Sequence, residues 1–176
     1  MTRDLGYVLG LVCGGILGII FVIFFQRWTK KDHDVKCKYD ERQTLVIGRG
    51  YKRGFWTLVS GIILYGIIDS GREIRCIETM AVLMFIVAIG IMVFIGYCIW
   101  HEGYFALNEN RKRVLAGFLL CSLMNFAIFT MNVFHGNVIK DGVIQFEIIH
   151  LVWGILFIFI FLMVLAKTIR DRREDD

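Results

Sequence analysis

The sequence predicts an all-α integral membrane protein: a helical bundle with five transmembrane helices, its N-terminus outside the cell and its C-terminus inside. Hydrophobic residues make up 57% of the 176 positions, more apolar surface than a water-soluble domain of this length can bury. These residues form long blocks that are apolar on every side, so each block requires lipid or protein around its whole circumference. The basic residues gather in alternate connections between the blocks, and this asymmetry sets the orientation.

The five blocks are expected to form one membrane domain that covers residues 1–176. Four of them contain the roughly 20 residues that a helix needs to cross a hydrocarbon core of about 30 Å. The second block is shorter than this unless its helix begins near Gly50. The chain contains no proline, which favours straight helices over the interrupted helices of many transporters. The predicted spans are about 5–26, 55–70, 79–100, 114–134 and 149–166.

The orientation follows from the distribution of Lys and Arg. Sixteen of the twenty lie in the segment 27–54, in the connection at 111–113 or after the fifth block. Because positively charged connections remain in the cytoplasm, these three regions are expected inside. This arrangement places Cys37 inside and Cys76 outside. The first block is expected to remain as a span rather than to be removed as a signal peptide, because its leader carries no net basic excess.

A regular glycine spacing marks the first block. Gly6, Gly10, Gly14 and Gly18 recur every four residues, with Gly15 beside them. Small residues on one helix face let two backbones approach closely in lipid. The spacing therefore predicts a helix-packing face. Its partner is either a second copy of the chain or another membrane protein, or else the other helices of this bundle.

The segment 27–54 is expected to be a basic, amphipathic cytoplasmic segment that runs into the second span. Acidic residues stand early in it and basic residues late, which suits the dipole of a helix. The basic end is expected near anionic lipid headgroups. A solvated loop that only sets the topology is the alternative. The candidate interaction residues are Tyr39, Asp40, Glu41, Arg42, Gln43, Arg49, Lys52 and Arg53.

The same segment carries a resemblance. The run Tyr39-Asp-Glu-Arg-Gln43, followed by Arg49-Gly-Tyr-Lys52 and Gly54-Phe55, resembles a box in small multi-pass membrane proteins of Gram-positive Firmicutes. The function of those proteins is unknown, and their genes often lie beside genes of small helix-turn-helix regulators. The resemblance implies a bacterial cytoplasmic membrane and a link to a cytoplasmic regulator. It assigns no catalytic role to any residue.

Polar residues form a third feature, near the expected outer ends of the spans. Ionisable and amide side chains in this setting face water or one another, because lipid penalises them. They are expected either to line an outward-facing polar pocket for a cation, a metal or a proton relay, or to be ordinary interfacial residues. The set comprises Asp69, Glu78, Asn125, Asn132, His135, Glu147 and His150.

No catalytic motif is found. His101-Glu102 lacks the second histidine of a zinc-protease motif, and neither a nucleophile elbow nor a phosphate-binding loop occurs. We therefore expect no catalytic residue, no metal, no cofactor and no direct binding of nucleic acid. The favoured function is a membrane interaction or regulatory protein that acts through its basic cytoplasmic segment. Its expected partners are the lipid bilayer with its anionic headgroups, another copy or another membrane protein, and a cytoplasmic regulator. The alternative is a small transporter or channel subunit with an outward-facing polar pocket.

Overall fold

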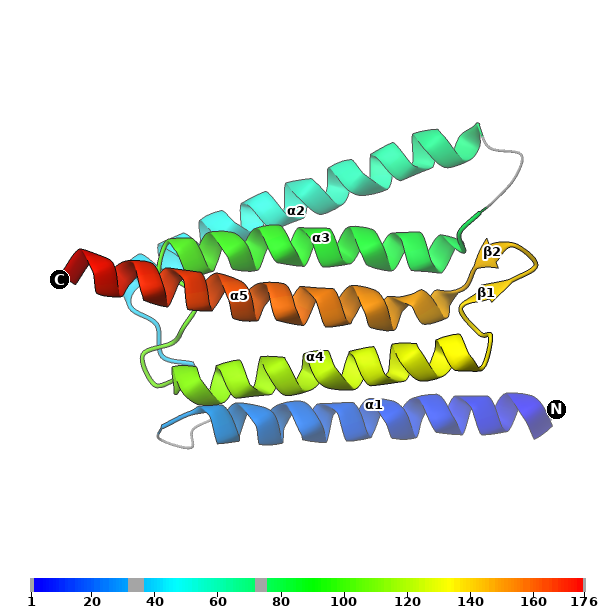
Figure 1. Cartoon of the computed structure of the whole chain (residues 1–176), viewed down its shortest axis with the longest axis horizontal. Coiled ribbons are helices and arrows are strands. Elements are labelled where there is room, and N and C mark those ends of the chain that lie inside the picture. Colours follow the sequence, from blue (N-terminus) through cyan, green and yellow to red (C-terminus); the bar gives the residue numbers. More distant parts are fainter. Residues whose placement is uncertain (1, 32–36, 72–75, 176) are drawn as a thin grey trace.

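The computed structural model describes residues 2–31, 37–71 and 76–175, and this part of the chain is dominated by long helices (Figure 1). A short β-hairpin and one 3-10 turn (η1) precede the last helix. The elements are α1 (Thr2–Thr29), α2 (Glu41–Ser70), α3 (Thr79–Trp100), α4 (Arg111–Phe134), β1 (Ile139–Lys140), β2 (Val143–Ile144), η1 (Phe146–Ile148) and α5 (Ile149–Asp175).

Four stretches of helix are long and apolar enough to cross a membrane: Val8–Thr29, Thr79–Trp100, Arg111–Phe134 and Phe146–Arg170. They confirm a multi-pass helical membrane protein. The two strands of the hairpin, of two residues each, are the only departure from helical structure among the elements given above. Helix α2 is not among them. Charged residues occupy its first half, and its apolar run is bounded by Arg53 and Asp69. This run is shorter than the roughly 20 residues that a perpendicular span needs.

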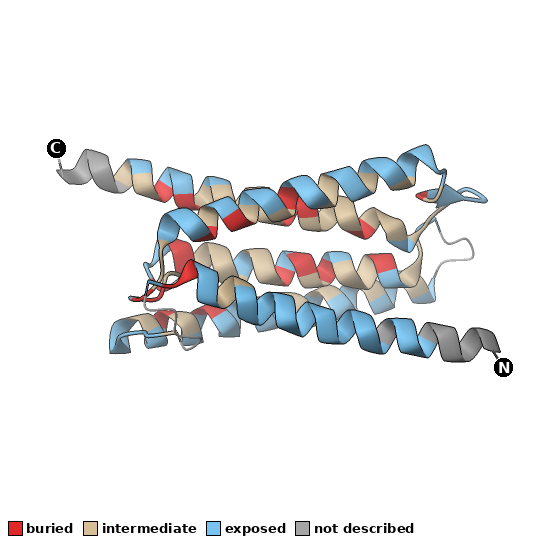
Figure 2. Cartoon of the chain, turned by 90° about the horizontal axis from the view of Figure 1, so that it is seen from below, coloured by how far each residue is buried: buried red, intermediate tan, exposed pale blue. Residues whose placement is uncertain are grey.

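The helices form a row in the order α2, α3, α5, α4, α1 (Figure 1). The core lies where α3 meets α5 and consists of Ala88, Ile99, Leu156, Ile160 and Val164. Aromatic and aliphatic side chains of both helices and of α4 pack around it. The two helices at the edges of the row, α1 and α2, are largely exposed (Figure 2). In a membrane the exposed apolar face of α1 is covered by lipid.

Helices α1, α2 and α5 extend beyond the apolar blocks of the sequence. The segment 27–54 is not one element, because α1 continues to Thr29 and α2 begins at Glu41. From there α2 continues without interruption through the second apolar block to Ser70. The charged C-terminal residues extend α5 as far as Asp175.

Glycine builds the close contact between α2 and α3. A Cβ placed on Gly54 would lie 3.0 Å from the carbonyl oxygen of Gly90 and 3.0 Å from Cβ of Phe94. A Cβ on Gly50 would lie 2.8 Å from Sγ of Cys98. Hydrogen at these positions therefore lets the two backbones approach more closely than any side chain would allow.

The glycine face of α1 has no such partner within the described part of the chain. A Cβ on Gly10, Gly14, Gly15 or Gly18 would meet no atom within 4 Å. Gly6 lies outside the residues whose surroundings are described. Helix α1 meets α4 near its C-terminal end, where Phe25 covers Gly117. Packing against the other helices of the bundle, one of the two partners expected for this face, is not observed at these four positions.

Candidate functional site

The first residues of α2 form a capping box. Asp40 has an extended backbone, and its carboxylate accepts a hydrogen bond of 2.6 Å from the backbone N–H of Gln43. In return, Oε1 of Gln43 accepts a bond of 3.3 Å from the N–H of Asp40. These two bonds satisfy N–H groups that the start of any helix leaves without an intrahelical partner. The run Asp40-Glu-Arg-Gln43 therefore fixes where α2 begins.

The same residues hold the connection between α3 and α4. Nε2 of Gln43 donates to the carbonyl oxygens of Glu102, at 3.2 Å, and Phe105, at 2.9 Å. Arg42 forms an ion pair with Glu102, with Nη2 and Oε2 2.8 Å apart. Both contacts join residues about sixty positions apart in the sequence. The start of α2 is consequently anchored to a loop rather than only to its own helix.

Glu102 is the central residue of this end of the protein. Its backbone adopts a left-handed conformation, with φ of 63°, which costs a non-glycine residue about 1–2 kcal/mol. Its second carboxylate oxygen lies 3.3 Å from Nζ of Lys167 on α5. The hydrogen bonds from Lys167 and from Arg42 lower the pKa of Glu102. One carboxylate thus ties α2 and α5 to the end of α3.

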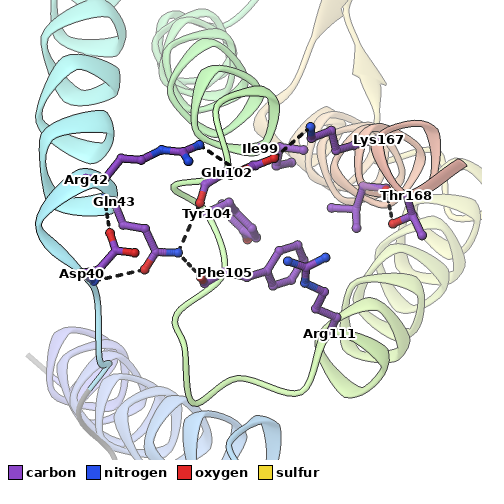
Figure 3. Close-up of a pocket in the computed structure, with 11 residues that line it drawn as sticks. Asp40, Arg42, Gln43, Ile99, Glu102, Tyr104, Phe105, Arg111, Lys167 and Thr168 are labelled. Carbon is purple, nitrogen blue, oxygen red and sulfur yellow. Dashed lines mark hydrogen bonds and ion pairs between the residues drawn. The ribbon is translucent and has the colours of Figure 1, made fainter. Parts of the chain in front are cut away.

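A cavity of about 180 Å³ opens beside this carboxylate (Figure 3). Three cations and two carboxylates reach it from α2, α4, α5 and the connection between α3 and α4. Arg111 is held at one side, its guanidinium carbon 5.3 Å from the centroid of the Phe105 ring. The lining residues are Asp40, Arg42, Gln43, Ile99, Glu102, Tyr104, Phe105, Arg111, Val164, Lys167 and Thr168.

Next to the cavity, the connection between α1 and α2 pairs with the connection between α3 and α4. The backbone N–H of Lys31 donates to the carbonyl of Asn108, and the N–H of Leu107 donates to the carbonyl of Lys38, both at 2.8 Å. Lys30 is only 1% exposed, and its Nζ lies 3.1 Å from Sγ of Cys37. All five helices are therefore linked at this end by polar contacts.

Burial changes the titration of three groups here. It is the largest cause of a raised pKa at Tyr39, at Tyr104 and at Glu109. A bond from the N–H of Ala106 and the charge of Lys30 act in the opposite direction on Glu109. Both tyrosines remain neutral at physiological pH, so they add no charge to this site.

The remaining basic residues predicted in the interaction segment lie further along α2. Arg49, Lys52 and Arg53 do not line the cavity beside Glu102 but a groove between α2 and α3. Glu41 is exposed in the first turn of α2. The interaction segment therefore divides into a part that organises the end of the bundle and a part that forms a separate basic groove.

The polar residues that the sequence predicts near the outer face make separate, mostly pairwise contacts. Oε2 of Glu78 accepts a hydrogen bond of 2.7 Å from the backbone N–H of Phe146. Nδ1 of His150 lies 3.3 Å from Oδ1 of Asn125, which links α4 with α5. The Tyr65 hydroxyl lies 3.2 Å from Asp69, and Nδ1 of His135 lies 2.7 Å from the carbonyl of Met131.

The helix ends that carry these polar residues lie at the same end of the row. The end of α2, the start of α3, the end of α4 and the start of α5 are all found there, opposite to the cavity beside Glu102, and the end of α2 slopes away from α3 (Figure 1). Asn132 accepts a bond from the N–H of Asn137 through its backbone carbonyl. Glu147 is half-buried in η1. Among the described residues, no group of three His, Cys, Asp or Glu side chains could hold a metal ion.

The chain is a multi-pass helical membrane protein, because it has several apolar helices of membrane-spanning length. Ion pairs join its helices at one polar end. Comparison of the chain with protein-family models, with curated proteins and with solved structures finds no match.

Proposed function

We propose that this chain is a five-span interaction protein of a bacterial cytoplasmic membrane, with its N-terminus outside and its C-terminus inside. The end of the bundle around Glu102 faces the cytoplasm and docks a cytoplasmic partner such as a regulator. The basic residues at this end support the orientation, because positively charged connections stay inside. Helix α2 supplies the fifth span: its apolar run between Arg53 and Asp69 is short, and a bilayer accommodates such a run by local thinning and by flanking basic side chains that reach the interface.

The observation that carries the proposal is the surface around Glu102, where ion pairs and hydrogen bonds join several helices. Arg42 and Lys167 meet on one carboxylate, and Gln43 holds two carbonyls of the connection between α3 and α4. A surface that is already ordered before binding loses little conformational entropy when a partner docks. This arrangement suits recognition, and the described residues around the cavity include no nucleophile paired with a base.

A small transporter or channel subunit is the second candidate. The contact between Asn125 and His150 favours it, because polar groups inside a bundle often mark a pathway. The core between α3 and α5 argues the other way. Leu156, Ile160 and Val164 are almost fully buried there among apolar neighbours, which leaves water no polar lining along this contact.

Photo-crosslinking tests the proposal with a matched pair of sites. Leu107 lies in the connection between α3 and α4 and is 61% exposed, whereas Ile139 lies in β1 at the other end and is 62% exposed. A photoreactive amino acid at Leu107 is expected to give a discrete adduct with a cytoplasmic protein in bacterial cells, and the same residue at Ile139 is expected to give none. Adducts from neither site, together with solute flux in liposomes, would favour the transporter.

A further inference from the structure

Three cations of α2 line an open groove where the polar half of the helix gives way to its apolar half. The groove has a volume of about 570 Å³ and lies between α2 and α3. Arg49 and Arg53 are four residues apart and Lys52 stands between them, so one face of α2 presents all three. Trp56 of α2 and Val93 of α3 continue the lining toward the apolar side.

The position of Arg53 is fixed by aromatic rings. Its guanidinium carbon lies 4.2 Å from the centroid of the Tyr97 ring. That ring stacks on His101, with the centroids 4.0 Å apart. Such cation–π contacts orient a guanidinium without neutralising its charge. In the described part of the chain, no carboxylate forms an ion pair with Arg49, Lys52 or Arg53. The groove therefore presents three uncompensated positive charges.

A second groove adjoins the first and is apolar. It has a volume of about 410 Å³, lies between α3 and α5, and shares Arg53, Val93 and Tyr97 with the basic groove. Gly96 leaves room along α3, since a Cβ there would meet Phe159 at 3.8 Å and no atom more closely. The three positive charges therefore lie beside an apolar groove of the kind that an alkyl chain fills.

We propose that the two grooves together bind one anionic phospholipid. Arg49, Lys52 and Arg53 hold its phosphate, and one acyl chain follows the apolar groove along α3. Guanidinium and ammonium groups bind phosphate through charge-assisted hydrogen bonds. Trp56 is 57% exposed at the same level, as expected for an anchor in the headgroup region. The apolar groove selects a lipid over a free phosphate. This inference rests on the proposed placement of α2 across the membrane.

Native mass spectrometry of the full-length protein in mild detergent measures the binding. Wild type is expected to retain phosphatidylglycerol and to lose phosphatidylcholine. A basic residue beside an anionic surface contributes about 1 kcal/mol, so Arg53→Gln should weaken phosphatidylglycerol binding about fivefold. Replacing Arg49, Lys52 and Arg53 together by Gln should abolish retention.

The matched control replaces Arg111, Lys112 and Arg113 by Gln, which removes the same charge at the same end of the bundle. The control is expected to retain the lipid. Equal losses in the two triple variants would overturn the site, because they would show only a general attraction between a basic surface and an anionic lipid.

Two further measurements separate the phosphate from the acyl chain. Short-chain phosphatidylglycerol should displace the bound lipid, and an excess of inorganic phosphate should not; equal displacement would make this a free-phosphate site and overturn the assignment. Gly96→Leu fills the apolar groove without changing charge and should also reduce retention. Unchanged retention in a folded Gly96→Leu protein would overturn the acyl-chain groove. If the triple variant of α2 does not fold, Arg53→Gln and Gly96→Leu decide. Crosslinking from Leu107 reports separately on the cytoplasmic partner.

Discussion

Adding one methyl group at Gly54 is expected to separate tertiary packing from helix propensity. In an exposed helix, replacing glycine by alanine stabilises by about 1 kcal/mol. At Gly54 the new Cβ would lie 3.0 Å from the carbonyl oxygen of Gly90 and 3.0 Å from Cβ of Phe94. Neither atom is the end of a flexible side chain, so α2 and α3 must move apart. Overpacking of this kind costs about 1–3 kcal/mol. With the gain in helix propensity subtracted, we expect a net loss of up to about 2 kcal/mol for Gly54→Ala.

Gly48→Ala is the control for this experiment. Gly48 lies six residues earlier on the same helix and is exposed, and a Cβ added to it would meet no atom within 4 Å. This variant should be neutral or stabilised by up to about 1 kcal/mol. The measurement is the free energy of unfolding from circular dichroism during titration of mixed micelles with a denaturing detergent. Equal changes for the two variants, in either direction, would refute the close contact between α2 and α3.

Three other predictions use different readouts. Glu102→Gln should cost less than about 1 kcal/mol at neutral pH, because the ion pairs of Glu102 are half-exposed. Since the pKa of Glu102 is lowered, wild type should lose this advantage as the pH falls below the usual glutamate value of 4.5 through the lowered pKa, which denaturation at several pH values would show. Gly14→Leu should leave the unfolding free energy unchanged or raise it by up to about 1 kcal/mol, because a Cβ there meets no atom within 4 Å and leucine favours a helix more than glycine does. A lost oligomer on size-exclusion chromatography would place a second chain on that face, and an unfolded variant would contradict the open face. An impermeant maleimide should label Cys76 in intact cells and Cys37 only after permeabilisation; the reverse pattern would invert the proposed orientation.

The position at which α2 begins is predictable from the sequence. Asp40-x-x-Gln43 has the spacing of a capping box, with an acidic N-cap and a glutamine three residues later. The sequence pattern indicated these residues as an interaction segment instead. Their observed contacts show a local role, starting the helix, together with a long-range role, holding the connection between α3 and α4.

No local sequence pattern indicates the role of Glu102. Its partners Arg42 and Lys167 lie 60 and 65 residues away along the chain, so no local pattern connects them. Its left-handed backbone is equally hidden, because a glutamate is not a residue type that indicates positive φ. The residue became important only when the fold brought the ends of α2, α3 and α5 to one place.

Hydropathy by itself determined that this chain is a multi-pass helical membrane protein, because apolar blocks of spanning length have few other stable states. Spacing also determined which residues share a helix face. What it could not determine is which faces meet. The most regular glycine pattern, on α1, lies at the edge of the row beside open space, whereas the less regular Gly50 and Gly54 form the close contact with α3. A glycine face allows two helices to approach closely but does not require it. The order of the helices in the bundle decides where the close approach takes place.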